Sequence, residues 1–175
     1  MGTTSKRTNQ LPVEVLAIIR LGSAKQKIQY LMEPGIQDVS RLAFKDDADA
    51  GVRGAAVRDA QSDATRLAFK DDTDSWVRRA AVRGAKSDAT RLAFKDDVDF
   101  WVRGTAVSGA KSDATRLAFI DDAHDGVRAE AVRGMQSIAA LQLALERVKD
   151  PYTKAAIQVR MNVVGETEAP QKSVA

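Results

Sequence analysis

The sequence predicts an all-α solenoid of about four 25-residue two-helix repeats with diverged terminal caps. The motif Leu-Ala-Phe-Lys-Asp-Asp recurs every 25 residues, with Ile120 replacing the Lys of the last copy. The copies stand at 42–47, 67–72, 92–97 and 117–122. Each period holds two short helical patterns joined by an Asp-rich turn. Two helices of this length cannot bury a core alone, so stacking on neighbouring repeats is expected to stabilise them.

The repeat at 61–85 illustrates the expected helices. The first spans 63–69 and the second spans 76–85, with Val77, Ala81 and Ala85 forming one apolar stripe at a spacing of four. A short polar side chain before each helix can accept a hydrogen bond from a free backbone N–H. The candidate N-caps are Ser62 or Asp63 for the first helix and Asp74 or Ser75 for the second.

The segments outside the regular repeats read as caps and tails, because a terminal repeat has one face without a neighbour. Two apolar helices precede the repeats, and a longer apolar helix followed by a degenerate unit ends them. The expected organisation is a flexible N-terminus at 1–10, capping helices at 11–35, repeats at 36–136, a C-terminal degenerate repeat at 137–164 and a disordered tail at 165–175.

Composition excludes several kinds of chemistry. The 175 residues include no Cys, which excludes disulfides, thiolate metal sites and thiol catalysis. The single His124 allows no histidine cluster and disfavours a Ser–His–Asp mechanism. No apolar run approaches the roughly 18 residues of a membrane span, and the chain starts without a signal-peptide pattern. We therefore expect a cytoplasmic protein that is not an enzyme and carries no cofactor.

A family resemblance rests on the pattern Leu-Ala…Asp-x-Asp-x-x-Val-Arg-x-x-Ala-Val. It is seen at Leu67-Ala68, Asp72-Thr73-Asp74 and Val77-Arg78-Arg79-Ala80-Ala81-Val82. The pattern resembles HEAT-like repeats of the short bacterial and archaeal type, including the phycobilisome-lyase group, and is similar to leucine-rich-repeat variants. The resemblance implies a right-handed α-solenoid whose second helices line a concave, usually protein-binding side. Without Cys, the iron–sulfur cluster of leucine-rich-repeat variants does not carry over, and no residue marks a chromophore site.

The acidic turns are interpreted as structural rather than metal-binding. Clustered carboxylates suit Ca²⁺ or Mg²⁺, but Trp76 stands at the next alternate position after Asp72 and Asp74, so the EF-hand spacing fails. We expect one Asp of each turn to cap the second helix, and Asp72 or Asp74 to pair with Arg78 or its counterparts. Because the turn recurs in every repeat, it reads as a fold contact. His124 is interpreted as a solvated turn residue.

The second helices differ between repeats on one face only. The variable positions are those of Trp76, Arg79, Ala80 and Arg83, which follow the i, i+3, i+4, i+7 spacing of a single helical face. A stacking face should repeat, so the variable face is expected to be exposed. It defines the candidate partner-binding residues Trp76, Trp101, Phe100, Arg58, Arg79, Arg83 and Arg133.

Exposed Trp and Arg are the residues enriched at interface hot spots. The alternative is that each Trp merely packs on the next repeat, although Gly51 and Gly126 at the same position indicate that the fold needs no large side chain there. The sequence thus favours a non-enzymatic protein-binding adaptor or inhibitor. The alternative function is nucleic-acid binding through these arginines and a second basic row. That row consists of Arg41, Arg66, Arg91 and Arg116 with Lys45, Lys70 and Lys95.

Overall fold

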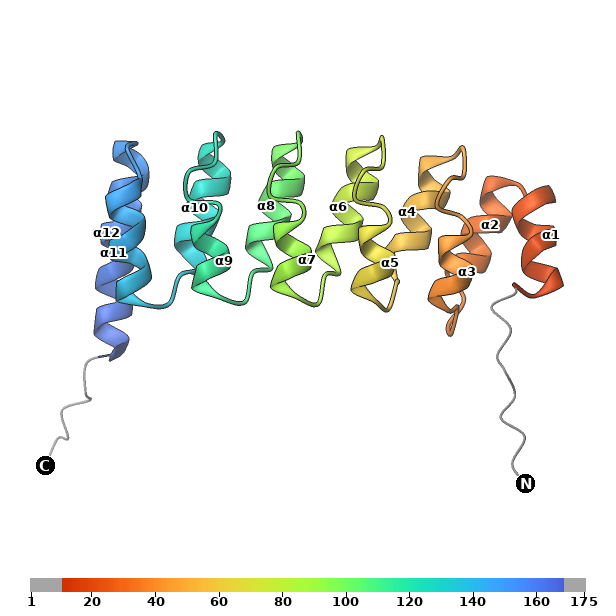
Figure 1. Ribbon diagram of the computed structural model, residues 1–175, viewed down its shortest axis with the longest axis horizontal. Coiled ribbons are helices and arrows are strands. Elements are labelled where there is room, and N and C mark those ends of the chain that lie inside the picture. Colours follow the sequence, from red (N-terminus) through yellow and green to blue (C-terminus); the bar gives the residue numbers. More distant parts are fainter. Residues whose placement is uncertain (1–10, 169–175) are drawn as a thin grey trace, which may run out of the picture. The chain divides into compact units, whose positions relative to one another are not determined.

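The computed structural model describes residues 11–168, and this part of the chain contains twelve α-helices and no strand. The predicted all-α class is therefore confirmed (Figure 1). Two compact units divide the chain, residues 1–84 and residues 85–175, here called unit 1 and unit 2. The residues expected to form a flexible N-terminus, 1–10, lie outside the described residues.

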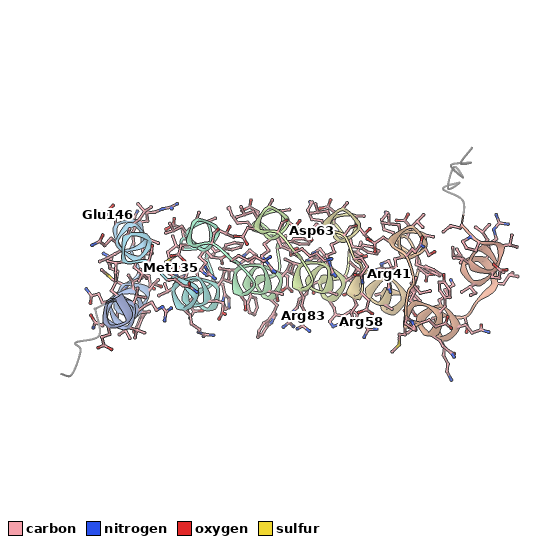
Figure 2. All side chains as sticks on the ribbon, turned by 90° about the horizontal axis from the view of Figure 1, so that it is seen from below. Arg41, Arg58, Asp63, Arg83, Met135 and Glu146 are labelled. Carbon is pink, nitrogen blue, oxygen red and sulfur yellow. The ribbon has the colours of Figure 1, made fainter. Side chains whose placement is uncertain are left out.

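Unit 1 is built in two layers. The longer helices α2, α4 and α6 pack side by side, while the short helices α3 and α5 form a second layer against α4 and α6 (Figures 1 and 2). The helices are α1 (Val13–Leu21), α2 (Ala24–Leu31), α3 (Asp38–Leu42), α4 (Ala50–Arg58), α5 (Asp63–Leu67) and α6 (Ser75–Arg83).

Unit 2 has the same two layers. Helices α8, α10 and α12 pack in one row, and α9 and α11 pack together in the other. The helices are α7 (Asp88–Leu92), α8 (Phe100–Ser108), α9 (Asp113–Leu117), α10 (Asp125–Gly134), α11 (Ile138–Arg147) and α12 (Pro151–Glu168). The tail boundary expected at 165 falls inside α12, whose later turns are held by the buried side chain of Val164. The remainder, 169–175, lies outside the described residues.

The core repeats with the sequence. The Phe of each Leu-Ala-Phe motif is about 1 % exposed, and the first Val of each second helix is buried equally well. The predicted stripe of Val77, Ala81 and Ala85 is buried. Burying aliphatic and Phe side chains contributes about 1.5–3 kcal/mol each, so this recurring set holds the helices together. The fully buried side chains of the two series are Phe44, Phe69, Phe94, Phe119, Val52, Val77, Val102 and Val127.

The caps resolve both sequence alternatives. The Ser62 hydroxyl accepts from the backbone N–H of Thr65, so Ser62 is the first-helix cap. The Asp74 carboxylate accepts from the N–H groups of Trp76 and Val77, so Asp74 caps the second helix. The first helices end earlier than expected, at Leu67 in this repeat, because the chain tightens there into i→i−3 hydrogen bonds.

Arginine–aspartate pairs connect successive repeats within each unit. In unit 1, Nε and Nη2 of Arg53 donate to the two carboxylate oxygens of Asp72 at 2.7 and 2.9 Å. In unit 2, Arg103 makes the same bidentate pair with Asp122 at 2.6 and 2.8 Å. The sequence predicts that Asp72 pairs with Arg78 or with one of its counterparts in other repeats. The partner is the counterpart Arg53 of the preceding repeat, which donates to both carboxylate oxygens. Arg78 donates to the backbone carbonyl of Asp72, as Arg53 does to that of Asp47.

Candidate functional site

Trp76 lies on the solvent side of unit 1, and one edge of its ring packs against the neighbouring helix α4. It begins the exposed face of α6 and is 55 % exposed. The ring lies over Gly54 of the neighbouring helix α4, where an added Cβ would come within 2.1 Å of Cζ3 of Trp76. Only a glycine leaves this room, so the ring is seated on α4 while more than half of the side chain stays accessible.

The candidate arginines of unit 1 lie on the same two helices as Trp76. Arg58 ends α4 and Arg83 ends α6, and both side chains project from one side of the unit (Figure 2). Arg58 has Asp59 at 3.8 Å, with both side chains about half exposed, an arrangement that contributes little energy in water. Arg79 is half-buried on α6. Unit 1 therefore presents an aromatic ring and guanidinium groups on the α4–α6 face, defined as Arg58, Trp76, Arg79 and Arg83.

The aromatic residues of unit 2 form a small cluster. Trp101 is 58 % exposed on α8 and its ring centroid lies 4.9 Å from that of Phe100. Phe100 in turn stacks on the imidazole of His124, with centroids 3.9 Å apart and ring planes 6° from parallel. The tilted geometry of the Phe100–Trp101 pair is one that stabilises aromatic contacts. Trp101 therefore has a fixed neighbour in its own unit, as Trp76 does in unit 1.

His124 has a structural role that the interpretation as a solvated turn residue missed. It stands one period after the capping residue Asp99 and two periods after Asp74, and its Nδ1 accepts from the backbone N–H of Gly126 at 3.1 Å. The imidazole thus replaces a carboxylate as N-cap of α10 while it packs on Phe100. Alignment of the repeats could have revealed the cap. Nothing in the repeat pattern could have revealed the stacking, because Phe100 has no aromatic counterpart.

Arg133, the remaining predicted site residue, has an exposed side chain that forms an ion pair within its own helix. Its guanidinium lies 2.7 Å from the carboxylate of Glu130, one turn earlier on α10. Arg133 occupies the position in unit 2 that Arg58 and Arg83 occupy in unit 1. The same position thus carries an exposed guanidinium in both units, with a closer carboxylate partner for Arg133 than for Arg58.

The carboxylates of the acidic turns are occupied by hydrogen bonds. Burial is the strongest single influence on Asp72 and raises its pKa, but the hydrogen bonds from Arg53 and from the backbone of Asp74 more than reverse it, leaving the pKa below 3.8. Outside these turns, burial likewise raises the pKa of the half-buried Asp88 at the start of α7, but hydrogen bonds from the backbone N–H groups of Lys111 and Ser112 more than reverse it. Among residues 11–168, no group of three or more His, Asp or Glu side chains is placed to hold a metal ion.

The second basic row is largely internal, which corrects the expectation that it forms a nucleic-acid edge. Its arginines are 3–8 % exposed. The Arg66 guanidinium donates to the carbonyls of Val57 and Ala60 and lies against Gly84, so burial lowers its pKa. Arg41, labelled in Figure 2, likewise donates to backbone carbonyls of unit 1, those of Leu31 and Ala56. Charge alone cannot separate a surface row from a buried one. The buried arginines are Arg41, Arg66, Arg91 and Arg116.

The lysines of that row each pair with the next residue. The distances from Nζ to the Asp carboxylate are 2.5 Å for Lys45, 2.5 Å for Lys70 and 2.7 Å for Lys95. A hollow of about 420 Å³ in unit 1 and one of about 640 Å³ in unit 2 are lined by these turns and by the Arg53 and Arg103 pairs. Both hollows occupy the same place in the repeat, so they reflect how the repeats stack.

Comparison with known proteins leaves the family open. No protein-family model, curated protein or solved structure matches this chain. None of the described helices is long and apolar enough to cross a bilayer. The sites to be explained are thus the α4–α6 face of unit 1 and the aromatic cluster of unit 2, defined as Phe100, Trp101 and His124.

Proposed function

We propose that the chain is a right-handed, HEAT-like solenoid of about four repeats that acts as a non-enzymatic protein-binding adaptor or inhibitor. The observation that carries the proposal is the pair of tryptophans at equivalent positions of α6 and α8, each more than half exposed. The equivalent positions in α4 and α10 hold Gly51 and Gly126, so stacking of the repeats does not require an aromatic ring there.

The setting of each tryptophan suits recognition. A ring already held by its neighbours loses little conformational freedom when a partner covers it, which leaves more of the contact energy for affinity. Gly54 seats Trp76, and Phe100 packs beside Trp101. Truncating a rigid, exposed Trp at the centre of an interface typically weakens binding by about 2 kcal/mol or more.

Protein is favoured over nucleic acid as the partner. Phosphate binding depends on the number of accessible cations, and the buried arginine row and the Asp-paired lysines contribute little to such a surface. The net charge of the whole chain is only +3. Exposed Asp46, Asp71 and Asp96 would also repel phosphates.

Comparative capture tests the proposal. The immobilised chain is exposed to extract from its source organism with and without nuclease, beside Trp76→Ala, Trp101→Ala and the control Val98→Ala. Val98 is 91 % exposed and lies outside the proposed faces. We expect a set of proteins retained by the unaltered chain and the control, lost with the Trp variants and unaffected by nuclease. Loss of the set on nuclease treatment would support nucleic-acid binding instead, and equal capture by all variants would contradict the proposed site.

A further inference from the structure

The exposed arginines at the ends of the second helices have weaker carboxylate partners in unit 1 than in unit 2, where Glu130 lies 2.7 Å from Arg133. Residues 1–84 contain fourteen Lys and Arg against eleven Asp and Glu, whereas residues 85–175 contain thirteen of each. On the α4–α6 face, the guanidinium of Arg83 makes no hydrogen bond or ion pair with any described residue, and that of Arg58 lies 3.8 Å from the carboxylate of Asp59. In unit 2, Ser108 and the paired Arg133 stand at the same positions.

We propose that the α4–α6 face binds an acidic segment of a partner protein, which places an apolar side chain on Trp76 and carboxylates beside Arg58 and Arg83. The inference rests on the proposed protein-binding function and adds the chemistry of the partner. Arginine donates to a carboxylate in a bidentate manner, and both arginines project from the side of the unit that also carries the face (Figure 2).

The spacing of the two arginines suggests the form of the segment. They occupy equivalent positions on α4 and α6, which pack side by side, and packed helix axes lie about 8–10 Å apart. An extended chain advances about 3.3 Å per residue. Carboxylates roughly three residues apart along an extended segment therefore match the two guanidinium groups. The Trp76 ring lies over Gly54, about one helical turn before Arg58, so it is within reach of an apolar side chain of the same segment.

Fluorescence anisotropy with synthetic probes tests this inference. The probe is a short fluorescein-labelled peptide with Glu residues three apart on both sides of a central Leu-Phe pair. Its matched control carries Gln in place of every Glu. The full chain is compared with Arg58→Glu/Arg83→Glu, with Trp76→Ala and with Arg133→Glu, the unit 2 equivalent. An oligothymidylate probe of similar charge runs in parallel, and circular dichroism confirms that each variant is folded.

We expect the acidic peptide to bind at least tenfold more tightly than its Gln control. The double Arg variant should lose about tenfold or more, while Arg133→Glu should stay within about twofold. Equal binding of both peptides with loss in Trp76→Ala would overturn the acidic inference and leave the protein-binding face intact. Binding of neither peptide, or insensitivity to all three variants, would count against both. Tighter binding of the oligothymidylate would assign the face to nucleic acid.

Discussion

The pair α4–α6 in unit 1 and the pair α8–α10 in unit 2 share one scaffold and carry different surfaces. Each has a bidentate Arg–Asp bridge, Arg53–Asp72 in one and Arg103–Asp122 in the other, with matching distances within 0.1 Å. Their exposed faces differ completely. The first pair seats Trp76 on Gly54, whereas the corresponding Gly104 of the second has only a Val127 methyl at 3.9 Å.

This difference indicates that the buried residues, caps and Arg–Asp bridges stabilise the fold, whereas separate, exposed residues determine the chemistry of the surface. Buried Val, Ala and Phe side chains, caps and Arg–Asp bridges recur in each unit because every repeat meets a similar neighbour. The exposed positions of the second helices meet no such constraint, so they are free to carry specificity. Changes to the shared scaffold should therefore act equally in both units, while changes to the faces should act in one.

The largest expected effect is on the shared core. Val77→Asp in unit 1 and Val102→Asp in unit 2 each place a carboxylate where the native side chain is fully buried, which costs several kcal/mol. Both variants should lose the helical circular dichroism signal at room temperature. Val98→Asp, at a 91 % exposed site, should melt like the unaltered chain. A folded Val77→Asp variant would contradict the assignment of this stripe to the core.

Breaking an Arg–Asp bridge should be the next largest effect. In Asp72→Ala the Arg53 side chain, only 12 % exposed, keeps its charge without a carboxylate partner, and such losses cost about 3–5 kcal/mol. Asp122→Ala should cost the same in unit 2, measured as the free energy of unfolding in urea. The control Asp71→Ala removes an 85 % exposed carboxylate beside Lys70 and should cost under about 1 kcal/mol. Equal costs for Asp71 and Asp72 would refute the bridge as a major contact.

Acid should weaken both units through these same carboxylates. The folded pKa values of Asp72 and Asp122 lie below 3.8, the ordinary value expected in the unfolded chain. The unfolded state thus binds more protons as the pH falls, so the bridges contribute fully above pH 3.8 and lose their contribution as the pH drops through the folded pKa. Urea unfolding should give a constant free energy from about pH 5 to 8 and a decline below about pH 4. The decline should be shallower in Asp72→Ala, and an unchanged slope would exclude this carboxylate as a cause.

The smallest expected effect separates the two faces. Gly104→Ala meets ordinary contact distances and should stabilise the chain by about 0.5–1 kcal/mol, because Gly is a poor helix residue. Gly54→Ala should give no such gain, since the new methyl group would occupy the place of the Trp76 ring. In a Trp101→Phe background, Gly54→Ala should shift Trp76 fluorescence to the red, and Gly104→Ala should not. Identical gains with no fluorescence change would show that Gly54 does not seat the ring.

The sequence predicts the structural contacts that recur in every repeat, but not the contacts that occur in one repeat alone. The Val77 stripe and the Asp74 cap follow from local patterns that recur every 25 residues, so their physical role could be inferred. The contact between the Trp76 ring and Gly54 joins two different helices. Because it does not recur at the corresponding Gly104, no repeat pattern in the sequence indicates it. The sequence predicts Arg66 to be part of a basic edge, because it shows the cation but not the carbonyl groups of Val57 and Ala60 that accept from it.

The central proposal is that the exposed faces bind a partner protein, and that their tryptophan side chains contribute to this binding but little to the stability of the fold. A protein captured in a nuclease-independent way is titrated into the unaltered chain, Trp76→Ala, Trp101→Ala and Val98→Ala, and unfolding in urea is measured on the same samples. The account predicts that each Trp variant loses about 2 kcal/mol of binding and less than about 1 kcal/mol of stability, while the control loses neither. Unchanged affinity, or a stability loss of roughly 3–5 kcal/mol typical of a core deletion, would contradict it.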